Sequence, residues 1–341
     1  MIALFTPEKG TVALRQVPEP RVVNPTDVVI KVTTSAICGS DLHIKERVIP
    51  RVDPSVILGH EYVGRIVEVG EAIRDLRVGD RVIGGPAFWC GRCFYCRKGA
   101  PQYCLKGGVY GYSLNGSHAE FMRLVYAENC LVKVPEDVPD EEAVLIGDVL
   151  QTGFHGAKQA EITPGDVVAV FGCGPIGIGA VISCFLFGPK EVIAVDVVPF
   201  RLRLAEEFGA LALDANKHDP VQIIRERTKG MGADAVIEAT GSPSAFQNAL
   251  RSVRRGGVVS VVGVFGKPVE FPIDKYSQYG VTVKMGLGYL GWMGNLLGLV
   301  ESRRISLSKI ITHTFPLDKA IEAYRVFETE RDSCLKVVLK N

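Results

Sequence analysis

Residues 167–177 read VVAVFGCGPIG, and this stretch decides the fold of the second half of the chain. Its five leading apolar residues predict a buried strand that runs into a G-x-G-x-x-G pattern and a helix-like segment, Pro175 to Phe187. Gly172 permits the tight turn, Gly174 lets the backbone approach a pyrophosphate, and Gly177 lets the helix pack closely on the strand. Free N–H groups at the helix start suit phosphate oxygens. The stretch therefore predicts a dinucleotide-binding fold.

Strand and helix patterns continue to alternate after this motif. Glu191 to Val195 is a second apolar run, Pro199 to Phe208 has helical character, and Ala235 to Ile237 and Val258 to Val262 are further candidate strands. This alternation predicts a parallel sheet with helices on both faces. Past about residue 288 it stops, and two helix-like segments and a final strand, Leu335 to Leu339, are expected to return to the first part of the chain.

Asp196 directly follows the second apolar run, about 20 residues beyond the glycines, where a carboxylate can accept hydrogen bonds from both ribose hydroxyls. A carboxylate there repels a 2′-phosphate, so the position favours NAD(H) over NADP(H). The alternative is a plain glycine turn in which Asp196 is a helix N-cap. Arg201 either lies over the adenine ribose or is a solvated helix residue, and its contact with a phosphate would permit NADP(H).

Length and composition describe ordinary globular domains. The chain has 341 residues, of which 47% are hydrophobic and 23% charged, enough for about two domains with full cores. A net charge of +1 gives no electrostatic case for nucleic acid or an anionic membrane. The N-terminus lacks a signal-peptide pattern and no apolar stretch is long enough to span a bilayer, so we expect a cytoplasmic protein. Its nine cysteines are then metal ligands or buried thiols.

The first 150 or so residues contain short runs rich in Val, Ile and Thr that Gly and Pro interrupt. Val28 to Thr34, Val63 to Val69 and Arg81 to Gly84 are examples, and they predict irregular β structure. In the same part, the pattern C-x2-C-x2-C-x7-C places four thiols within 15 residues. Four thiolates can close around a structural zinc and leave no position open for substrate; an iron–sulfur cluster is the competing interpretation. The four residues are Cys90, Cys93, Cys96 and Cys104.

Two shorter polar clusters come earlier, CGSDLH at residues 38–43 and GHE at residues 59–61. Alone they define no metal site, because a Cys and a His more than 20 residues apart make no spacing motif, and a single His is more often structural. With the four cysteines and the later glycine motif, they occur in the order found in the zinc-containing medium-chain alcohol dehydrogenases. The chain resembles this family over essentially its whole length, and most closely its bacterial secondary-alcohol dehydrogenases.

The resemblance implies an α/β fold of two domains. Residues 1–150, completed by 289–341, would form an irregular, β-rich, GroES-like catalytic domain, and residues 151–288 a Rossmann NAD-binding domain with a doubly wound parallel sheet. It also implies a catalytic and a structural zinc, NAD(H) as cofactor, a small alcohol or ketone as substrate and assembly as a homotetramer. Pro175, Ile176 and Thr152 resemble positions beside the cofactor, although Ile176 and Thr152 are equally well explained as packing residues.

Carried over position by position, Cys38, His60 and Asp148 are similar to the ligands of the catalytic zinc, with Asp148 in place of the second thiolate that other members have. Glu61 resembles a carboxylate that lies behind the zinc and enters its coordination transiently. Asp41 would accept a hydrogen bond from the outer nitrogen of His60 and fix its orientation.

The resemblance also implies a mechanism for oxidising an alcohol. The alcohol would bind zinc as an alkoxide and give a hydride to nicotinamide, while Ser40 passes the proton through a ribose hydroxyl to His43. Lys336 is a further candidate for contact with the cofactor. A polyol, formaldehyde or amino-alcohol dehydrogenase on the same scaffold is the alternative. A non-catalytic NAD-binding scaffold or a zinc-free quinone reductase is disfavoured, because neither needs this set of residues.

Overall fold

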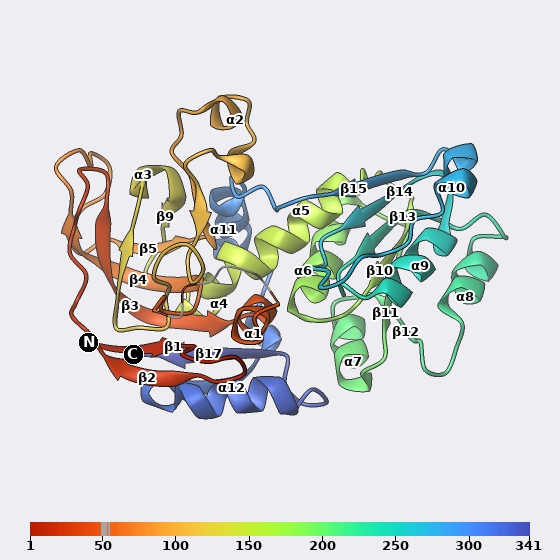
Figure 1. Ribbon diagram of the computed structural model, residues 1–341. Helices are drawn as coiled ribbons and strands as arrows, with labels where there is room; N and C mark the ends of the chain where they lie inside the picture. The colour runs from red at the N-terminus through yellow and green to blue at the C-terminus, as the bar shows by residue number, and fades with distance from the viewer. Residues whose placement is uncertain (49–52, 54) are drawn as a thin grey trace. The chain divides into compact units, whose positions relative to one another are not determined.

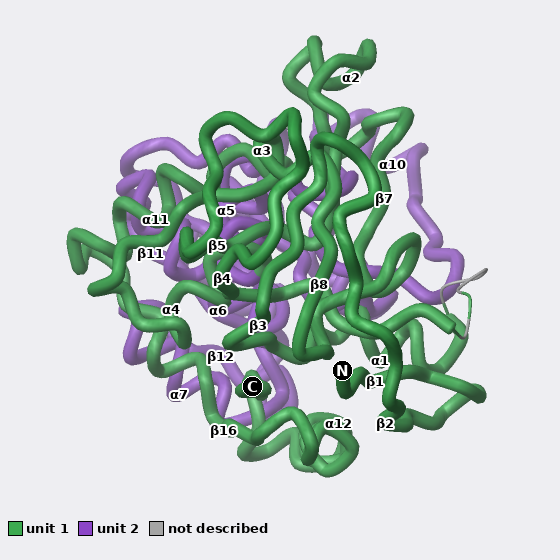
Figure 2. The backbone as a smooth tube through the Cα atoms, turned by 90° about the vertical axis from the view of Figure 1, so that its left-hand side faces the viewer, with its two compact units in different colours: residues 1–148, 289–341 green, residues 149–288 purple. Residues whose placement is uncertain are grey.

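The computed structural model describes residues 1–48, 53 and 55–341. These residues form two compact units (Figure 2). Unit 1 comprises Met1–Asp148 and Tyr289–Asn341, and unit 2 comprises Val149–Gly288. The division falls next to residue 150, where the sequence pattern changes from irregular β structure to alternating strands and helices. Among the described residues, every helix is too short or too polar to cross a bilayer.

Unit 2 contains a six-stranded parallel sheet with the order β12-β11-β10-β13-β14-β15 (Figure 1). Helix α6 packs on β10, α7 on β11 and α9 on β13, so the apolar strands are covered by helices. The strand order reverses at β10, and ligands of such sheets bind at the carboxyl ends of the strands at this point. The strands are β10 (Val167–Phe171), β11 (Glu191–Asp196), β12 (Leu211–Asp214), β13 (Ala233–Glu238), β14 (Val253–Val261) and β15 (Thr282–Met285). The helices are α5 (Gln151–Gln159), α6 (Pro175–Cys184), α7 (Pro199–Glu207), α8 (Pro220–Arg227), α9 (Pro243–Ser252) and α10 (Ile273–Tyr279).

Two elements of unit 2 differ from the sequence prediction. The helix expected to reach Phe187 ends at Cys184 and continues as a 3₁₀ turn, because Gly188 adopts a left-handed conformation (φ 70°) that stops the helix. Strand β14 begins at Val253 rather than Val258. Its first part contains two arginines and two glycines, so no apolar pattern marks it as a strand.

Unit 1 is built on a seven-stranded sheet with the order β16-β17-β3-β4-β5-β9, in which β8 also pairs with β3. The C-terminal strand β17 (Lys336–Lys340) pairs antiparallel with β3 (Val28–Ile37), so the end of the chain completes the first unit. The other strands are β1 (Ile2–Phe5), β2 (Ala13–Gln16), β4 (Glu61–Val69), β5 (Arg81–Gly84), β6 (Ala87–Phe88), β7 (Gly108–Val109), β8 (Phe121–Leu124), β9 (Leu131–Lys133) and β16 (Ile311–Pro316). The α-helices are α1 (Gly39–Lys45), α2 (Phe94–Arg97), α3 (Ala127–Cys130), α4 (Asp140–Leu145), α11 (Met293–Glu301) and α12 (Ala320–Thr329).

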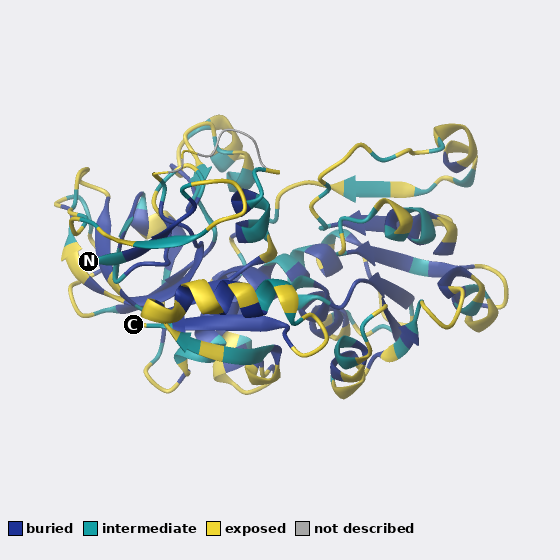
Figure 3. Cartoon of the chain, turned by 60° about the horizontal axis from the view of Figure 1, so that its bottom comes forward, coloured by how far each residue is buried: buried dark blue, intermediate teal, exposed yellow. Residues whose placement is uncertain are grey.

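Buried apolar side chains fix the two long strands that lead to the polar clusters of unit 1. Figure 3 shows the strands mostly buried and the connecting loops mostly exposed. Val28, Ile30 and Val32 of β3 share one core cluster with Ile66 of β4. Ile37, at the far end of β3, belongs to a second cluster that includes residues of β17 and α12. The end of β3 and the start of β4 are therefore held rigidly.

Candidate metal and nucleotide sites

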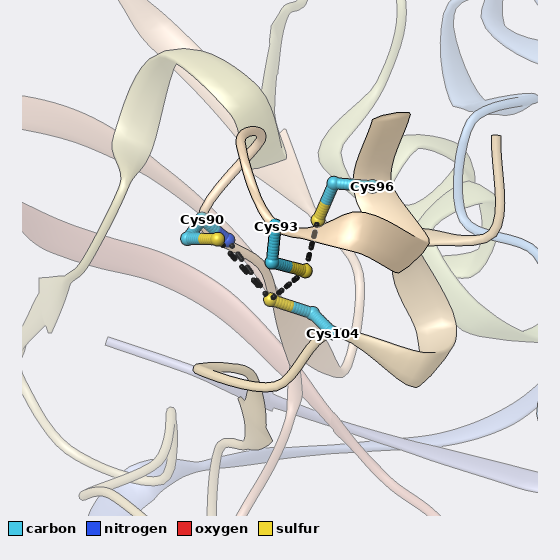
Figure 4. Close-up of side chains that lie close together, drawn as sticks. All are labelled: Cys90, Cys93, Cys96 and Cys104. Carbon is cyan, nitrogen blue, oxygen red and sulfur yellow. Dashed lines mark hydrogen bonds between the residues drawn. The ribbon is translucent and has the colours of Figure 1, made fainter. Parts of the chain in front are cut away.

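The four cysteines converge in a lobe between β6 and β7, which we call the cysteine lobe (residues 90–104; Figure 4). The Sγ atoms of Cys93 and Cys96 are 3.5 Å apart, those of Cys93 and Cys104 3.8 Å, and those of Cys90 and Cys104 3.5 Å. Zn–S bonds of about 2.3 Å in a tetrahedron place two sulfurs about 3.8 Å apart. All four thiols are free, and their sulfurs lie within 4.8 Å of one another. This spacing fits one ion better than an iron–sulfur cluster, whose thiolates must span several irons.

Backbone N–H groups prepare the cysteine lobe for thiolates. Those of Cys96 and Leu105 lower the pKa of Cys93 to about 6. The N–H of Cys90 donates to Sγ of Cys104 at 3.3 Å. Charge on Cys93 is therefore stabilised locally, whereas burial and the neighbouring Cys93 and Cys104 side chains raise the pKa of Cys96 to about 12.

The second candidate metal site assembles from three segments that are far apart in the sequence. The antiparallel pairing of β3 with β4 sets Ala36 opposite Glu61, so Cys38, just beyond β3, comes close to His60, just before β4. Asp148 joins them from the turn after α4, with its Oδ2 3.6 Å from Cys38 Sγ and 3.8 Å from His60 Nε2. The ligand atoms of Cys38, His60, Asp148 and Glu61 all lie within 4.8 Å of one another. We call these four residues the buried cluster.

The chemistry of the buried cluster fits a divalent cation. A thiol, an imidazole and carboxylates are all zinc ligands, and three protein ligands with one open position are typical of catalytic zinc. Burial raises the pKa of the Cys38 thiol, and the Asp148 carboxylate raises it further. Burial also raises the pKa of Glu61 to about 8. Several acidic groups buried together are costly, and a cation between them would offset that cost.

Asp148 lies in a π-helical turn, Ile146–Leu150, between α4 and α5. Single π turns inside helices are rare and occur often at functional sites. Gly147 makes this turn possible, because a Cβ there would lie 2.3 Å from the carbonyl oxygen of Gly84 in β5. The close approach of this turn to β5 brings the Asp148 side chain to the cluster. No periodicity in the sequence predicts such a turn.

Two charged side chains support the buried cluster. Asp41 accepts the N–H of Cys38 at 2.9 Å through Oδ2. Its Oδ1 is 3.4 Å from Nδ1 of His60, but neither atom makes a hydrogen bond in the described residues, so the orienting role stays a prediction. Lys336 differs from expectation, because its ammonium group forms an ion pair with Glu61 and is 1% exposed. Sequence reasoning missed this pair, whose members are 275 residues apart. It also missed His118, a buried neighbour of Asp41.

The two residues expected to carry the proton lie on α1. Ser40 Oγ is 3.7 Å from Cys38 Sγ, so the hydroxyl is adjacent to the proposed metal position. His43 follows three residues later on the same helix face. Within the described part of the chain, its Nδ1 is buried and has no hydrogen-bond partner. Both residues are half-buried.

The glycine motif of unit 2 forms the turn that its sequence predicts. Gly172 has φ 93°, and a Cβ on Gly177 would lie 1.8 Å from the carbonyl oxygen of Gly172. Gly174 is the N-cap of α6, and a Cβ there would meet no atom within 4 Å, so space for a ligand lies beside it. Pro175 and Ile176 form the half-exposed first turn of α6. This geometry fits a pyrophosphate at the helix N-terminus.

Asp196 ends β11 and joins the glycine turn to the next helix. Its Oδ2 accepts the N–H of Cys173 at 2.6 Å, and its Oδ1 accepts those of Val197 and Val198 at 2.7 and 2.9 Å. Val198 is the N-cap of α7. The alternative interpretation of Asp196 as the helix N-cap is therefore wrong, although its carboxylate accepts the N–H of Val198. In the described residues, Nε of Arg201 is buried without a hydrogen-bond partner.

Thr152 is the remaining residue expected beside the cofactor. It lies in the first turn of α5, half-buried, and its hydroxyl is 3.8 Å from the position of a Cβ on Gly288. The contacts of Thr152 within unit 2 are compatible with packing and with a position beside the nicotinamide. Its contact with the cofactor therefore stays a prediction.

Comparison with known proteins agrees with the fold. The model of the alcohol dehydrogenase GroES-like domain matches residues 24–136, and that of the zinc-binding dehydrogenases matches residues 175–296. The uncharacterized zinc-type alcohol dehydrogenase-like protein AdhB of Bacillus subtilis strain 168 is 34% identical, over 96% of this chain and 97% of the relative. The chain therefore belongs to the zinc-containing medium-chain dehydrogenases, and the predicted fold class is confirmed.

Solved structures extend this comparison. The alcohol dehydrogenase TADH from Thermus sp. ATN1 is 38% identical with a TM-score of 0.94, over 100% of this chain and 99% of that one. A structure from Sinorhizobium meliloti 1021, described as a zinc-binding dehydrogenase bound to NADP, is 28% identical with a TM-score of 0.90, over 100% and 99% of the two chains. The relatives support a zinc-dependent alcohol oxidoreductase that uses a nicotinamide cofactor.

Proposed function

We propose that this protein is an alcohol dehydrogenase that uses NAD(H) and a catalytic zinc to interconvert small secondary alcohols and their ketones. The observation that carries the proposal is the convergence of Cys38, His60 and Asp148 on one buried position in unit 1. A protein that only bound a nucleotide would gain nothing from burying a thiol, an imidazole and a carboxylate together. The four-cysteine lobe would hold a second, structural zinc.

The side chains of unit 1 have separate tasks in this proposal. When bound, zinc would polarise the alcohol oxygen, and nicotinamide would accept the hydrogen of the carbinol carbon as a hydride. Cys38, His60 and Asp148 would hold the metal, and Glu61, which is paired with Lys336, would lie behind it. Ser40 would accept the proton of the alcohol, and His43 would deliver it to water.

NAD(H) rather than NADP(H) is proposed because of Asp196. Its buried carboxylate at the carboxyl end of β11 would accept from ribose hydroxyls and repel a 2′-phosphate. Arg201 is the residue through which NADP(H) would be accepted, and the relative bound to NADP shows that the family admits this cofactor. Initial rates with each cofactor test the choice. We expect a clear preference for NAD⁺, which Asp196→Asn should reduce about tenfold; equal rates in the wild type would contradict it.

The substrate class is inferred from the resemblance to bacterial secondary-alcohol dehydrogenases. NADH formation, followed by absorbance with a panel of alcohols before and after metal removal, tests it. We expect activity with propan-2-ol and butan-2-ol that chelation abolishes and zinc restores. Activity only with polyols, formaldehyde or amino alcohols would change the substrate and keep the mechanism. No activity with any alcohol would contradict the proposal and favour a binding scaffold.

The homotetramer and the cytoplasmic location are proposed on the same resemblance. Light scattering on the purified protein tests the oligomeric state, for which we expect four chains. A monomer would contradict this part of the proposal without affecting the catalytic part.

A further inference from the structure

His118 is a buried histidine that the proposed mechanism does not use. It follows Ser117 in the segment between β7 and β8, and it is 0% exposed. Its backbone N–H donates to the carbonyl oxygen of Leu58 at 2.9 Å, and its carbonyl oxygen accepts the N–H of Leu4 at 2.9 Å. The segment that carries His118 is thus hydrogen-bonded to the segment that leads into His60.

Nδ1 of the His118 imidazole is hydrogen-bonded, whereas Nε2 faces a carboxylate and makes no hydrogen bond within the described residues. Nδ1 is 3.2 Å from Oγ of Ser35, a residue of β3 that is 1% exposed. Nε2 is 3.6 Å from Oδ2 of Asp41. If the Ser35 hydroxyl donates to Nδ1, the ring carries its proton on Nε2, facing the carboxylate. The ring of Tyr324 packs edge-on against the imidazole with 5.8 Å between ring centroids.

Gly59 shows how closely the ring is fitted against the metal-binding segment. A Cβ on Gly59 would lie 2.5 Å from Nδ1 of His118, and the φ angle of Gly59 is 91°. Only glycine satisfies both conditions without strain. Because His60 is the next residue, the imidazole of His118 packs directly beside the backbone of a proposed metal ligand.

Asp41 connects the two histidines. Its carboxylate is 0% exposed, with Oδ1 toward Nδ1 of His60 and Oδ2 toward both Nε2 of His118 and the N–H of Cys38. A buried carboxylate needs donors on both oxygens. Without the His118 ring, Oδ2 would keep its hydrogen bond from the N–H of Cys38 but lose the imidazole 3.6 Å away, and the carboxylate would be free to tilt away from His60.

We propose that His118 is a positioning residue for the metal of the buried cluster: acting through Asp41, it fixes the imidazole of His60 in the orientation that binds the metal. In this series of neighbouring side chains, His60 would bind the metal, Asp41 would orient His60, and His118 with Ser35 would hold Asp41. The inference rests on the proposed catalytic zinc. Outer partners of metal-bound histidines change metal affinity about 10- to 100-fold when removed.

The test compares His118→Leu, which keeps a similar volume without a donor, with His118→Gln, which retains an amide donor. Zinc release from the buried cluster is measured by competition with a chelator, and the cluster is also loaded with Co²⁺ to record its visible d–d bands. For His118→Leu we expect zinc affinity about 10- to 100-fold lower and shifted Co²⁺ bands. For His118→Gln we expect partial rescue of both. The zinc of the cysteine lobe should remain bound in each variant.

Tyr110→Phe is the control for general loosening of unit 1. Tyr110 is 0% exposed, and its hydroxyl oxygen accepts the N–H of Val125 at 3.0 Å. We expect this variant to unfold at a lower temperature with zinc affinity unchanged. Wild-type affinity and Co²⁺ bands in His118→Leu would overturn the inference. An equal loss of affinity in Tyr110→Phe would also overturn it, because the role of His118 would then be merely structural.

Two further outcomes remain decisive. If His118→Leu does not fold, Ser35→Ala replaces it and should weaken zinc binding in the same direction by a smaller factor; unchanged affinity in Ser35→Ala would then overturn the inference. If the wild-type protein holds zinc only in the cysteine lobe, the proposed function fails before any variant of His118 is compared.

Discussion

The two candidate metal sites of unit 1 are built in opposite ways. The cysteine lobe takes all four ligands from residues 90–104, and three of its four cysteines are only half-buried. The buried cluster takes its ligands from the end of β3, the start of β4 and a π turn after α4. Asp41, Lys336 and His118 stand behind the buried cluster, whereas the lobe relies on backbone N–H groups.

This contrast follows from what each metal would do. A closed set of four thiolates is held together by the metal itself, so the chain needs only short turns between the ligands. A site with one open position must keep its geometry while substrate comes and goes, so the rest of the domain has to hold the ligands. In the proposed function, the metal would order the chain at the cysteine lobe, and the chain would order the metal at the buried cluster.

Asp148→Ala should produce the largest effect. Loss of one ligand of the buried cluster removes the ordered position for the alcohol oxygen, and we expect turnover to fall at least about 10⁴-fold. Zinc analysis should show about one ion per chain instead of about two. The residual zinc should resist mild chelation, because the cysteine lobe is unchanged. Substantial turnover with two zinc ions retained would show that Asp148 is not a ligand.

Ser40→Ala should leave both metals in place and act on the proton alone. Removing a group that transfers a proton in the transition state costs about 10²- to 10⁴-fold in turnover. The measurement is turnover at saturating alcohol and NAD⁺, with metal content determined on the same sample. Turnover equal to that of the wild type would exclude Ser40 from the proton path.

Cys93→Ser tests whether the cysteine lobe holds a structural zinc. We expect loss of the structural zinc and a free energy of unfolding lower by about 3 kcal/mol or more, because metal binding and ordering of the lobe are coupled. Cys130→Ser is the matched control: Cys130 is buried beside the lobe and accepts the N–H of Trp89 at 3.4 Å, but it is outside the four-cysteine set. The comparison fails if Cys130→Ser releases as much zinc as Cys93→Ser.

Asp140→Asn should have the smallest effect and tests a stabilising carboxylate of unit 1 that lies outside both candidate metal sites. Asp140 begins α4, the helix that leads to Asp148, and accepts hydrogen bonds from Arg81 at 2.9 Å and Thr34 at 3.0 Å. Burial alone would raise the pKa of Asp140, but hydrogen bonds from Thr33 and Arg81 outweigh it and hold the pKa below its usual range.

The stabilisation that Asp140 provides depends on pH. A lowered pKa in the folded state stabilises the protein above the unfolded pKa of about 3.9, and this contribution is lost as the pH falls through the folded value. Asp140→Asn should therefore be about 1 kcal/mol less stable than the wild type at neutral pH. Urea unfolding at several pH values should show the difference shrinking below about pH 4. A difference that is constant down to about pH 2 would contradict this account.

The sequence predicts one kind of site better than the other, for a physical reason. The cysteine spacing and the glycine motif are local, so the short chain between the ligands already limits their geometry. The sequence also predicts β5 and β10 to the residue, and glycine marks the end of each run. Cys38 and His60 meet only through the register of β3 and β4, and alone they had no recognisable spacing.

Local sequence patterns do not predict the roles of three residues at the buried cluster, Asp148, Lys336 and His118. Asp148 was identified only through the family resemblance, because a π turn leaves no periodic signal. Lys336 looked like a cofactor contact near the C-terminus, but the return of β17 to β3 buries it against Glu61. His118 carried no motif at all, and only the close approach to Gly59 and Asp41 reveals it.

The central claim is that the buried cluster holds a metal ion distinct from that of the cysteine lobe. Anomalous diffraction from crystals of the zinc-loaded protein, recorded on both sides of the zinc absorption edge, tests it most directly. The account predicts two zinc peaks per chain, one among the four cysteine sulfurs and one bounded by Cys38, His60 and Asp148. A single peak in the cysteine lobe, with none at the buried cluster, would contradict it.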